Sequence, residues 1–144
     1  MTSECTYTVS SVRKRRRKNR KSIEGPQSAV ALLRPLVRDQ DREAFYGIYL
    51  NTRNCVLAIE MISLGSLNAS IVHPREVFKP ALRLSAASLL VVHNHPSGDP
   101  EPSEDDLEIT KRLRDAGELL GIPLLDHVIL GQAAYRSLRE DGQI

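Results

Sequence analysis

The pattern of apolar and polar positions along the chain predicts a sheet built from several short strands. Leu89 to Val92 is an apolar run bounded by turn-forming residues, which is typical of a strand buried on both faces. Residues 43–50 and 55–61 have strand composition, and the turn sequence at 51–54 between them predicts a β-hairpin. Residues 124–130 predict a further strand.

Three segments have the spacing or the end signals of helices. Residues 29–37 place apolar side chains on one face, although Pro35 predicts a kink or an early end. A second helix is expected over 75–86, where Pro80 predicts a further kink. The third is expected over 103–121, because acidic residues in its first turn suit the helix dipole and a glycine ends it.

Two shorter segments complete the expected elements. Residues 63–70 predict a short strand, and residues 133–138 a short terminal segment. Strands interleaved with helices indicate an α/β or layered α+β architecture. A chain of 144 residues fits one domain.

Composition narrows the class of protein. The sequence has 41% hydrophobic residues, no tryptophan and 4% aromatics, so the core must be mainly aliphatic. No apolar run approaches the roughly 18 residues that span a bilayer, and no apolar segment follows the charged N-terminus as in a secretory signal. Cys5 and Cys55 show no ligand spacing. These features predict a cytoplasmic chain with free thiols and no membrane contact.

The charge is distributed unevenly. Residues 13–21 contain eight cations, whereas residues 22–144 carry 12 basic and 17 acidic side chains, a formal charge of −5. A run of like charges repels itself, so a basic, disordered tail is expected over 1–24 and a folded domain over 25–144. Residues 13–21 could bind DNA through contacts between their cationic side chains and the phosphates. A solubilising extension, or an artefact of the assigned start site, would explain the same basic composition.

The apolar run that ends at Val92 leads directly into the residues with the clearest chemistry. His93 and His95 lie one residue apart in an extended segment, so their rings point the same way. Ten residues then separate His95 from Asp106, which is enough for the chain to turn back. Two imidazoles and one carboxylate form the ligand set of a catalytic zinc site. A His-x-His sequence alone is weak support, and Ser103 with Asp106 also fits a helix capping box.

The whole string HNHPSGDPEPSEDD resembles the H-x-H-P…S-x-x-D signature of the JAMM metalloproteases, the JAB/MPN domain family. The asparagine between the histidines and the PSGDPxPS sequence resemble its RadC-like branch, as do HPREVFKPAL at 73–82 and LLDHVILG at 124–131. The resemblance covers roughly residue 25 to the C-terminus. It implies a cytidine-deaminase-like sheet flanked by helices, with Zn²⁺ held by His93, His95 and Asp106.

Hydrolysis also needs a general base, and composition alone leaves Glu43, Glu60 and Glu76 as candidates. The resemblance favours Glu43, because the family's catalytic glutamate lies at the start of an early strand. Glu76 matches a residue typical of the RadC-like branch, but a role in the first turn of a helix is simpler.

Three other polar residues have candidate roles. Ser103 matches the family serine that lies beside the metal-bound oxygen, and its hydroxyl would donate to an oxyanion, cap the helix, or do both. His127 is expected to be a partly buried, satisfied histidine, with support of a metal ligand as the alternative. His73 precedes a proline and predicts a turn or helix entry.

Two functions follow as hypotheses. The first is a zinc-dependent hydrolase that cleaves a peptide or isopeptide bond in a peptide or protein substrate. The second is a DNA-associated accessory module with a structural or vestigial metal site, based on the basic tail and on the description of RadC-like proteins as DNA repair proteins. The resemblance does not include the helix-hairpin-helix segment expected upstream in long RadC-like proteins, which weighs against the second hypothesis.

Overall fold

A mixed five-stranded sheet forms the centre of the domain. The computed structural model describes residues 20–65 and 72–144. The strand order is β2-β1-β3-β4-β5, in which β3 and β4 are parallel and every other neighbouring pair is antiparallel. The helices and strands, in chain order, are α1 (Pro26–Val37), β1 (Ala44–Leu50), β2 (Val56–Leu64), α2 (Pro74–Arg83), β3 (Ser88–Asn94), α3 (Glu104–Leu120), β4 (Leu124–Leu130) and β5 (Tyr135–Ser137).

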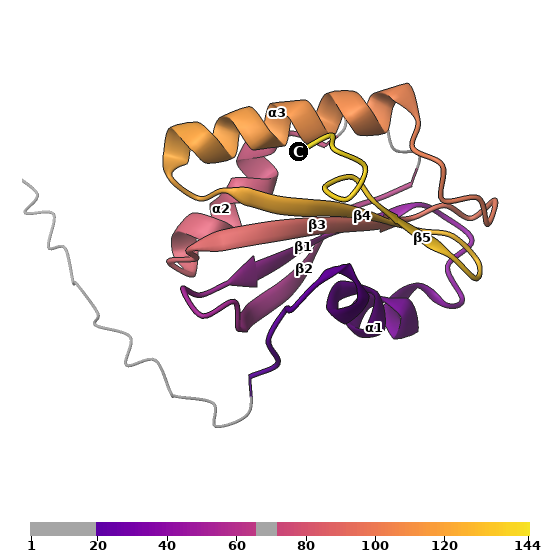
Figure 1. Cartoon of the computed structure of the whole chain (residues 1–144), viewed down its shortest axis with the longest axis horizontal. Coiled ribbons are helices and arrows are strands. Elements are labelled where there is room, and N and C mark those ends of the chain that lie inside the picture. The colour runs from indigo at the N-terminus through magenta and orange to yellow at the C-terminus, as the bar shows by residue number, and fades with distance from the viewer. Residues whose placement is uncertain (1–19, 66–71) are drawn as a thin grey trace, which may run out of the picture.

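Helices cover both faces of this sheet (Figure 1). Helix α1 packs on one face through a cluster of aliphatic side chains that includes Leu33 and Ile48. Helices α2 and α3 cover the opposite face, where Phe45, Val77 and Leu113 belong to a second cluster. The sheet is therefore the middle of three layers, which is the α/β layer architecture expected from the sequence.

Strand β3 lies at the middle of the sheet, and all seven of its residues are buried. This position explains its apolar run, since a strand between two neighbours and beneath helices on both faces has no solvent-exposed side. Strand β1 is buried along its whole length as well. The strand expected at 89–92 is confirmed, and it continues through His93 and Asn94.

The predicted hairpin is confirmed, with β1 and β2 antiparallel. The Asn51 side chain accepts hydrogen bonds from the Arg53 and Cys55 backbone N–H groups in the connecting turn. Strand β2 continues to Leu64, so the first part of the separate strand predicted at 63–70 belongs to the hairpin. Residues 66–71 lie outside the described part of the chain.

The helices differ from the predictions mainly at their ends. Helix α1 begins at Pro26, as suits proline in a first turn, and continues past Pro35. Helix α2 ends at Arg83 rather than at residue 86, because the following backbone turns and Ser85 adopts a positive φ of 53°. The first residue of the third predicted helix, Ser103, is its N-cap.

The segment before α1 attaches to the hairpin. The Val56 N–H donates to the Lys21 carbonyl, and the Ile23 N–H donates to the Asn54 carbonyl, both at 2.8 Å. The predicted tail as a whole is not described, since residues 1–19 lie outside the described part of the chain. Among the described residues, no helix combines the length and apolar character needed to span a membrane.

Candidate metal centre

The end of β3 carries the two histidines of the His-x-His sequence. His93 and His95 project to the same side of the sheet, as alternation along a strand requires, and their Nε2 atoms lie 3.0 Å apart. His93 is fully buried, whereas the His95 side chain keeps 12% of its accessible surface. Solvent therefore reaches the pair from the His95 side.

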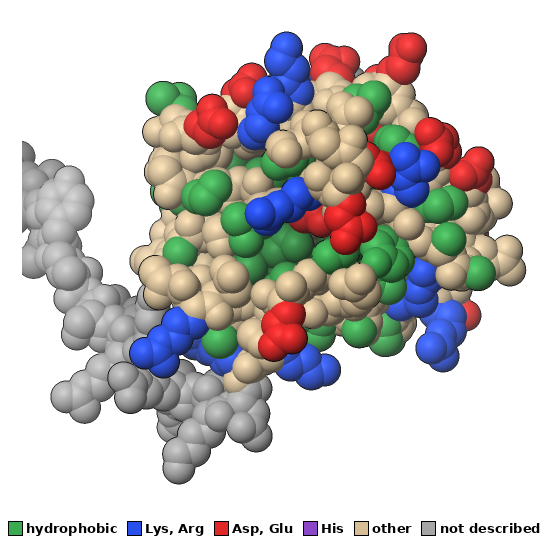
Figure 2. All heavy atoms as spheres, in the orientation of Figure 1, with side chains coloured by type: hydrophobic (Ala, Val, Ile, Leu, Met, Phe, Trp, Pro, Cys, Tyr) green, Lys and Arg blue, Asp and Glu red, His purple; other side chains and the backbone are tan. Residues whose placement is uncertain are grey.

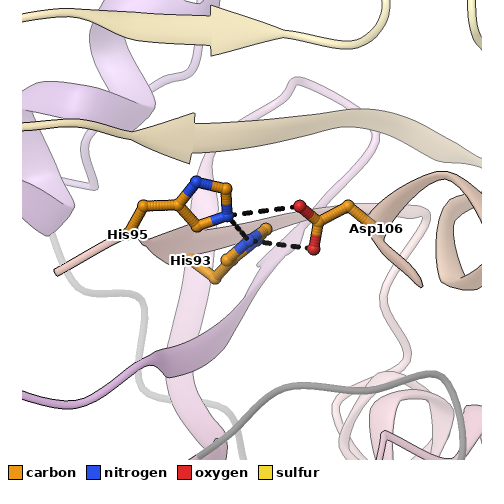
Figure 3. A group of neighbouring side chains, drawn as sticks. All are labelled: His93, His95 and Asp106. Atoms are coloured by element: carbon orange, nitrogen blue, oxygen red, sulfur yellow. Dashed lines mark hydrogen bonds and ion pairs between the residues drawn. The ribbon is translucent and has the colours of Figure 1, made fainter. Parts of the chain in front are cut away.

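Asp106, in the first turn of α3, faces both imidazoles (Figure 3). Its Oδ1 lies 3.2 Å from Nε2 of His93, and its Oδ2 lies 3.2 Å from Nε2 of His95. The same carboxylate closes a capping box: Oδ2 accepts from the Ser103 N–H at 2.8 Å, and Ser103 Oγ accepts from the Asp106 N–H at 3.1 Å. The cap and the metal-ligand arrangement are thus compatible, because the cap holds the carboxylate against the histidines.

The donor set of this triad fits a zinc ion. One ligand atom from each of His93, His95 and Asp106 can be chosen so that all lie within 4.8 Å of one another. Tetrahedral ligands at ~2.0–2.1 Å from zinc are separated by about 3.3 Å. The separations of 3.0–3.2 Å between the Nε2 and carboxylate oxygen atoms are close to that spacing. These three buried or half-buried side chains can therefore hold a metal ion.

The charges of the triad depend on one another. Burial alone would raise the pKa of the Asp106 carboxyl, but hydrogen bonds with His93, His95 and the Ser103 backbone hold this pKa well below its usual range. The pKa of His95 is raised, chiefly by its hydrogen bond with Asp106, and the negative charge of Glu43 adds to this effect. Asp106 is therefore ionised at neutral pH, as a metal-ligating carboxylate must be.

A third histidine lies behind His93. His127, on β4, is fully buried, and its Nε2 lies 2.8 Å from Nδ1 of His93. Phe45 stacks on the His93 ring with 5.9 Å between ring centroids, and meets the His127 ring edge to face. The prediction of a satisfied histidine is confirmed, but the ring is fully rather than partly buried. The hydrogen bond also favours the alternative, in which His127 supports a metal ligand.

Thr110 was not singled out from the sequence, although it belongs to the same group of contacts. Its Oγ1 lies 2.6 Å from Nδ1 of His127 and 2.6 Å from the backbone carbonyl of Asp106. The signal was its position four residues after Asp106, which places both side chains on one face of a helix.

Glu43 directly precedes β1. The antiparallel register pairs Phe45 with His93, and two further residues along that register bring Glu43 level with His95. Directly opposed residues of an antiparallel pair project to the same face, so Glu43 lies on the face that carries the triad. The side chain of Asn94 holds this segment, accepting from the Ala44 N–H at 2.8 Å and donating to the Arg42 carbonyl at 3.0 Å.

The other two glutamates considered from the sequence lie elsewhere. Glu60 pairs with Arg83, and Glu76 pairs with Lys79 at 3.0 Å. Both line a shallow surface cleft between β2 and α2. Glu76 lies in the first turn of α2, as expected, and His73 confirms its prediction as a helix-entry residue because its Nδ1 accepts from the Arg75 N–H.

The fold and this triad together define a class of protein: an α/β domain with a two-histidine, one-aspartate centre able to hold a metal at the end of its middle strand. Comparison with known protein families agrees with this description. The model for the RadC-like JAB domain matches residues 23–143, and the chain belongs to that family.

Individual relatives carry the name UPF0758 protein. One from Methanosarcina mazei is 51% identical over 123 residues, which cover 85% of this chain and 54% of that protein. One from Desulforamulus reducens is 54% identical over 122 residues, again 85% of this chain and 54% of the relative. One from Bacillus licheniformis is 52% identical over 127 residues, 88% of this chain and 57% of the relative. The chain thus spans about half the length of the curated relatives it matches.

Proposed function

We propose that this chain is a zinc-dependent hydrolase of the JAMM type that cleaves a peptide or isopeptide bond. The observation that carries the proposal is the convergence of His93, His95 and Asp106 at ligand spacing, with His95 reachable from solvent. Bound zinc supplies Lewis-acid chemistry, which makes water a nucleophile at neutral pH. Membership of the JAB family supports this chemistry, since the JAMM signature belongs to that domain.

Glu43 is the proposed general base, which takes the proton of the attacking water and returns it to the leaving amine. The register that brings Glu43 level with His95, together with the two backbone hydrogen bonds of Asn94, supports this assignment. Glu60 and Glu76 are poorer candidates, because their carboxylates pair with cations in a different cleft.

Ser103 is the proposed donor to the oxyanion that forms on the scissile carbonyl. Its Oγ accepts the Asp106 N–H in the capping box, so the hydroxyl hydrogen can be donated outward without breaking the cap. One hydroxyl thus serves the helix and the reaction at once.

The test is a screen of peptide and isopeptide substrates for zinc-dependent turnover, run with His95→Ala alongside. We expect the wild-type protein to bind about one zinc and to cleave at least one substrate in the screen. His95→Ala should lose both zinc binding and cleavage, because it lacks one of the three proposed protein ligands. Zinc-free wild-type protein, or cleavage that survives chelation and His95→Ala equally, would refute the proposal.

DNA contact through residues 13–21 is a separate proposal, supported by their eight cations. The face of the described domain in Figure 2 carries interspersed acidic and basic side chains rather than a continuous basic surface. The basic run at residues 13–21 is the segment to test. Deletion of residues 1–21 should abolish salt-dependent DNA binding and leave zinc binding intact. DNA binding that persists after the deletion would contradict this proposal.

A further inference from the structure

Two buried polar side chains connect two of the triad residues without belonging to the triad. His127 is fully buried and Thr110 is 2% exposed. A series of hydrogen bonds runs from the Asp106 carbonyl to Thr110 Oγ1, then to Nδ1 of His127, and then from Nε2 of His127 to Nδ1 of His93. The distances are 2.6, 2.6 and 2.8 Å in that order.

The direction of each bond follows from the chemistry of its ends. A backbone carbonyl can only accept, so the hydroxyl of Thr110 donates its single hydrogen to the Asp106 carbonyl. The oxygen of Thr110 must then accept in its contact with His127, which requires a hydrogen on Nδ1 of His127. The threonine therefore selects the Nδ1–H tautomer of His127.

The tautomer of His127 in turn selects that of His93. The two hydrogen bonds of the His127 ring are with the Thr110 hydroxyl and with His93, neither of which is an anion, so the fully buried ring carries a single hydrogen. Its Nε2 therefore carries a lone pair and accepts from Nδ1–H of His93. With a hydrogen held on Nδ1, His93 binds a metal through Nε2, the atom 3.2 Å from Oδ1 of Asp106, whose hydrogen the metal displaces.

His95 reaches the same tautomer in a different way. Its Nδ1 lies 2.8 Å from the backbone carbonyl of Asp99, which can only accept, so a hydrogen is held on Nδ1; Nε2, which donates to Asp106 when no metal is bound, is the atom that can give up its hydrogen to bind a metal. That support comes from the backbone, whereas the support of His93 comes from side chains that substitution can remove.

We propose that Thr110 and His127 are positioning residues that fix His93 with its Nε2 lone pair directed at the metal. The inference rests on the metal centre of the proposed function, but not on its hydrolytic reaction. Because Thr110 also bonds the carbonyl of Asp106, the same contacts couple the orientation of one ligand to the helix turn that supplies another. Ligating histidines generally need such a partner for the second ring nitrogen, and loss of the partner costs roughly 10–100-fold in metal affinity.

The experiment compares zinc affinities, measured by competition with a chromophoric chelator, in Thr110→Val and Thr110→Ser. Valine keeps the shape and removes the hydroxyl, so zinc affinity should fall roughly 10–100-fold. Serine keeps the hydroxyl and should restore affinity close to wild type. Ser137→Ala is the matched control, because it removes an equally buried hydroxyl that bonds Asp126 on the opposite face of β4. It should lower stability without changing zinc affinity.

A second measurement is independent of whether the variants fold. Nitrogen-15 chemical shifts of the imidazoles in zinc-loaded wild-type protein should show hydrogens on Nδ1 of His93 and His127, with Nε2 of His93 bound to zinc. A hydrogen on Nε2 of His127, or a folded Thr110→Val protein that binds zinc as tightly as wild type, would overturn the inference alone. Wild-type protein that binds no zinc would overturn both this inference and the proposed function, whereas zinc binding without hydrolysis would overturn only the latter.

Discussion

Replacement of Glu43 by glutamine separates metal binding from turnover. Glutamine has nearly the same shape as glutamate but cannot accept a proton at neutral pH. The two hydrogen bonds between Asn94 and the backbone on either side of residue 43 do not involve the Glu43 side chain, so they should hold glutamine in the same place. The variant should therefore lose the proton transfer and little else.

The size of the effect follows from this restriction. Positioned general acid–base groups contribute roughly 10²–10⁴-fold to rate. That range corresponds to about 3–5 kcal/mol of activation free energy. Since the proposed zinc ligands are other side chains, the zinc affinity of Glu43→Gln should stay close to wild type, and the loss should appear in kcat.

The assay is steady-state hydrolysis of a substrate found in the zinc-dependent screen, with zinc content measured on the same samples. Glu60→Gln and Glu76→Gln are the matched controls, because each removes one carboxylate charge from a surface ion pair. Both should leave turnover unchanged and alter stability little, because exposed ion pairs contribute little to it. Full activity in Glu43→Gln, or a large loss in Glu76→Gln instead, would show that Glu43 is not the base.

Three further predictions concern neighbouring groups. Asn94→Ala should lower kcat more than zinc affinity, because it frees the segment before β1 and leaves the ligands in place; equal losses in both would contradict this. Gly131→Ala should destabilise the domain by ~1–3 kcal/mol in chemical denaturation, since a Cβ there would lie 2.5 Å from the Gly98 carbonyl oxygen. In the zinc-free protein, the raised pKa of His95 should add to the free energy of unfolding. This contribution should be fully present below pH 6.5, the ordinary pKa of histidine, and should be lost as the pH rises through the pKa of His95 in the folded protein. His95→Gln should remove this loss of stability at higher pH.

The sequence predicted the triad because each part depends on local geometry. Alternation along a strand places His93 and His95 on one face, and the serine–aspartate spacing of a capping box fixes where the next helix begins. The structure has both features, with β3 extended to Asn94 and Ser103 as the N-cap of α3. The sequence alone did not show that one carboxylate can serve both the cap and the histidines.

Contacts between distant segments were harder to predict. His127 could be recognised as buried, but its place behind His93 depends on the parallel pairing of β3 with β4, which no local pattern specifies. Thr110 gains its role only through that pairing. The assignment of Glu43 also depends on a contact between distant segments. Composition left three glutamates as candidate general bases, and the β1–β3 register is what brings Glu43 level with His95. The predicted C-terminal end of α2 was wrong by three residues, because the turn with positive φ at Ser85 has no strong signal in the sequence.

The connection from β3 through α3 to β4 accounts for most of the centre. Strand β3 ends at the histidines, and the helix that follows begins beside that end, so its first turn supplies Asp106. One turn further along α3, Thr110 meets His127 on β4, which returns parallel to β3. The proposed ligands and their supporting residues therefore lie within one continuous stretch, residues 88–130, whereas Glu43 directly precedes β1, which runs antiparallel to β3. This separation is the physical reason why substitutions at Thr110 should affect zinc affinity while substitutions at Glu43 affect turnover.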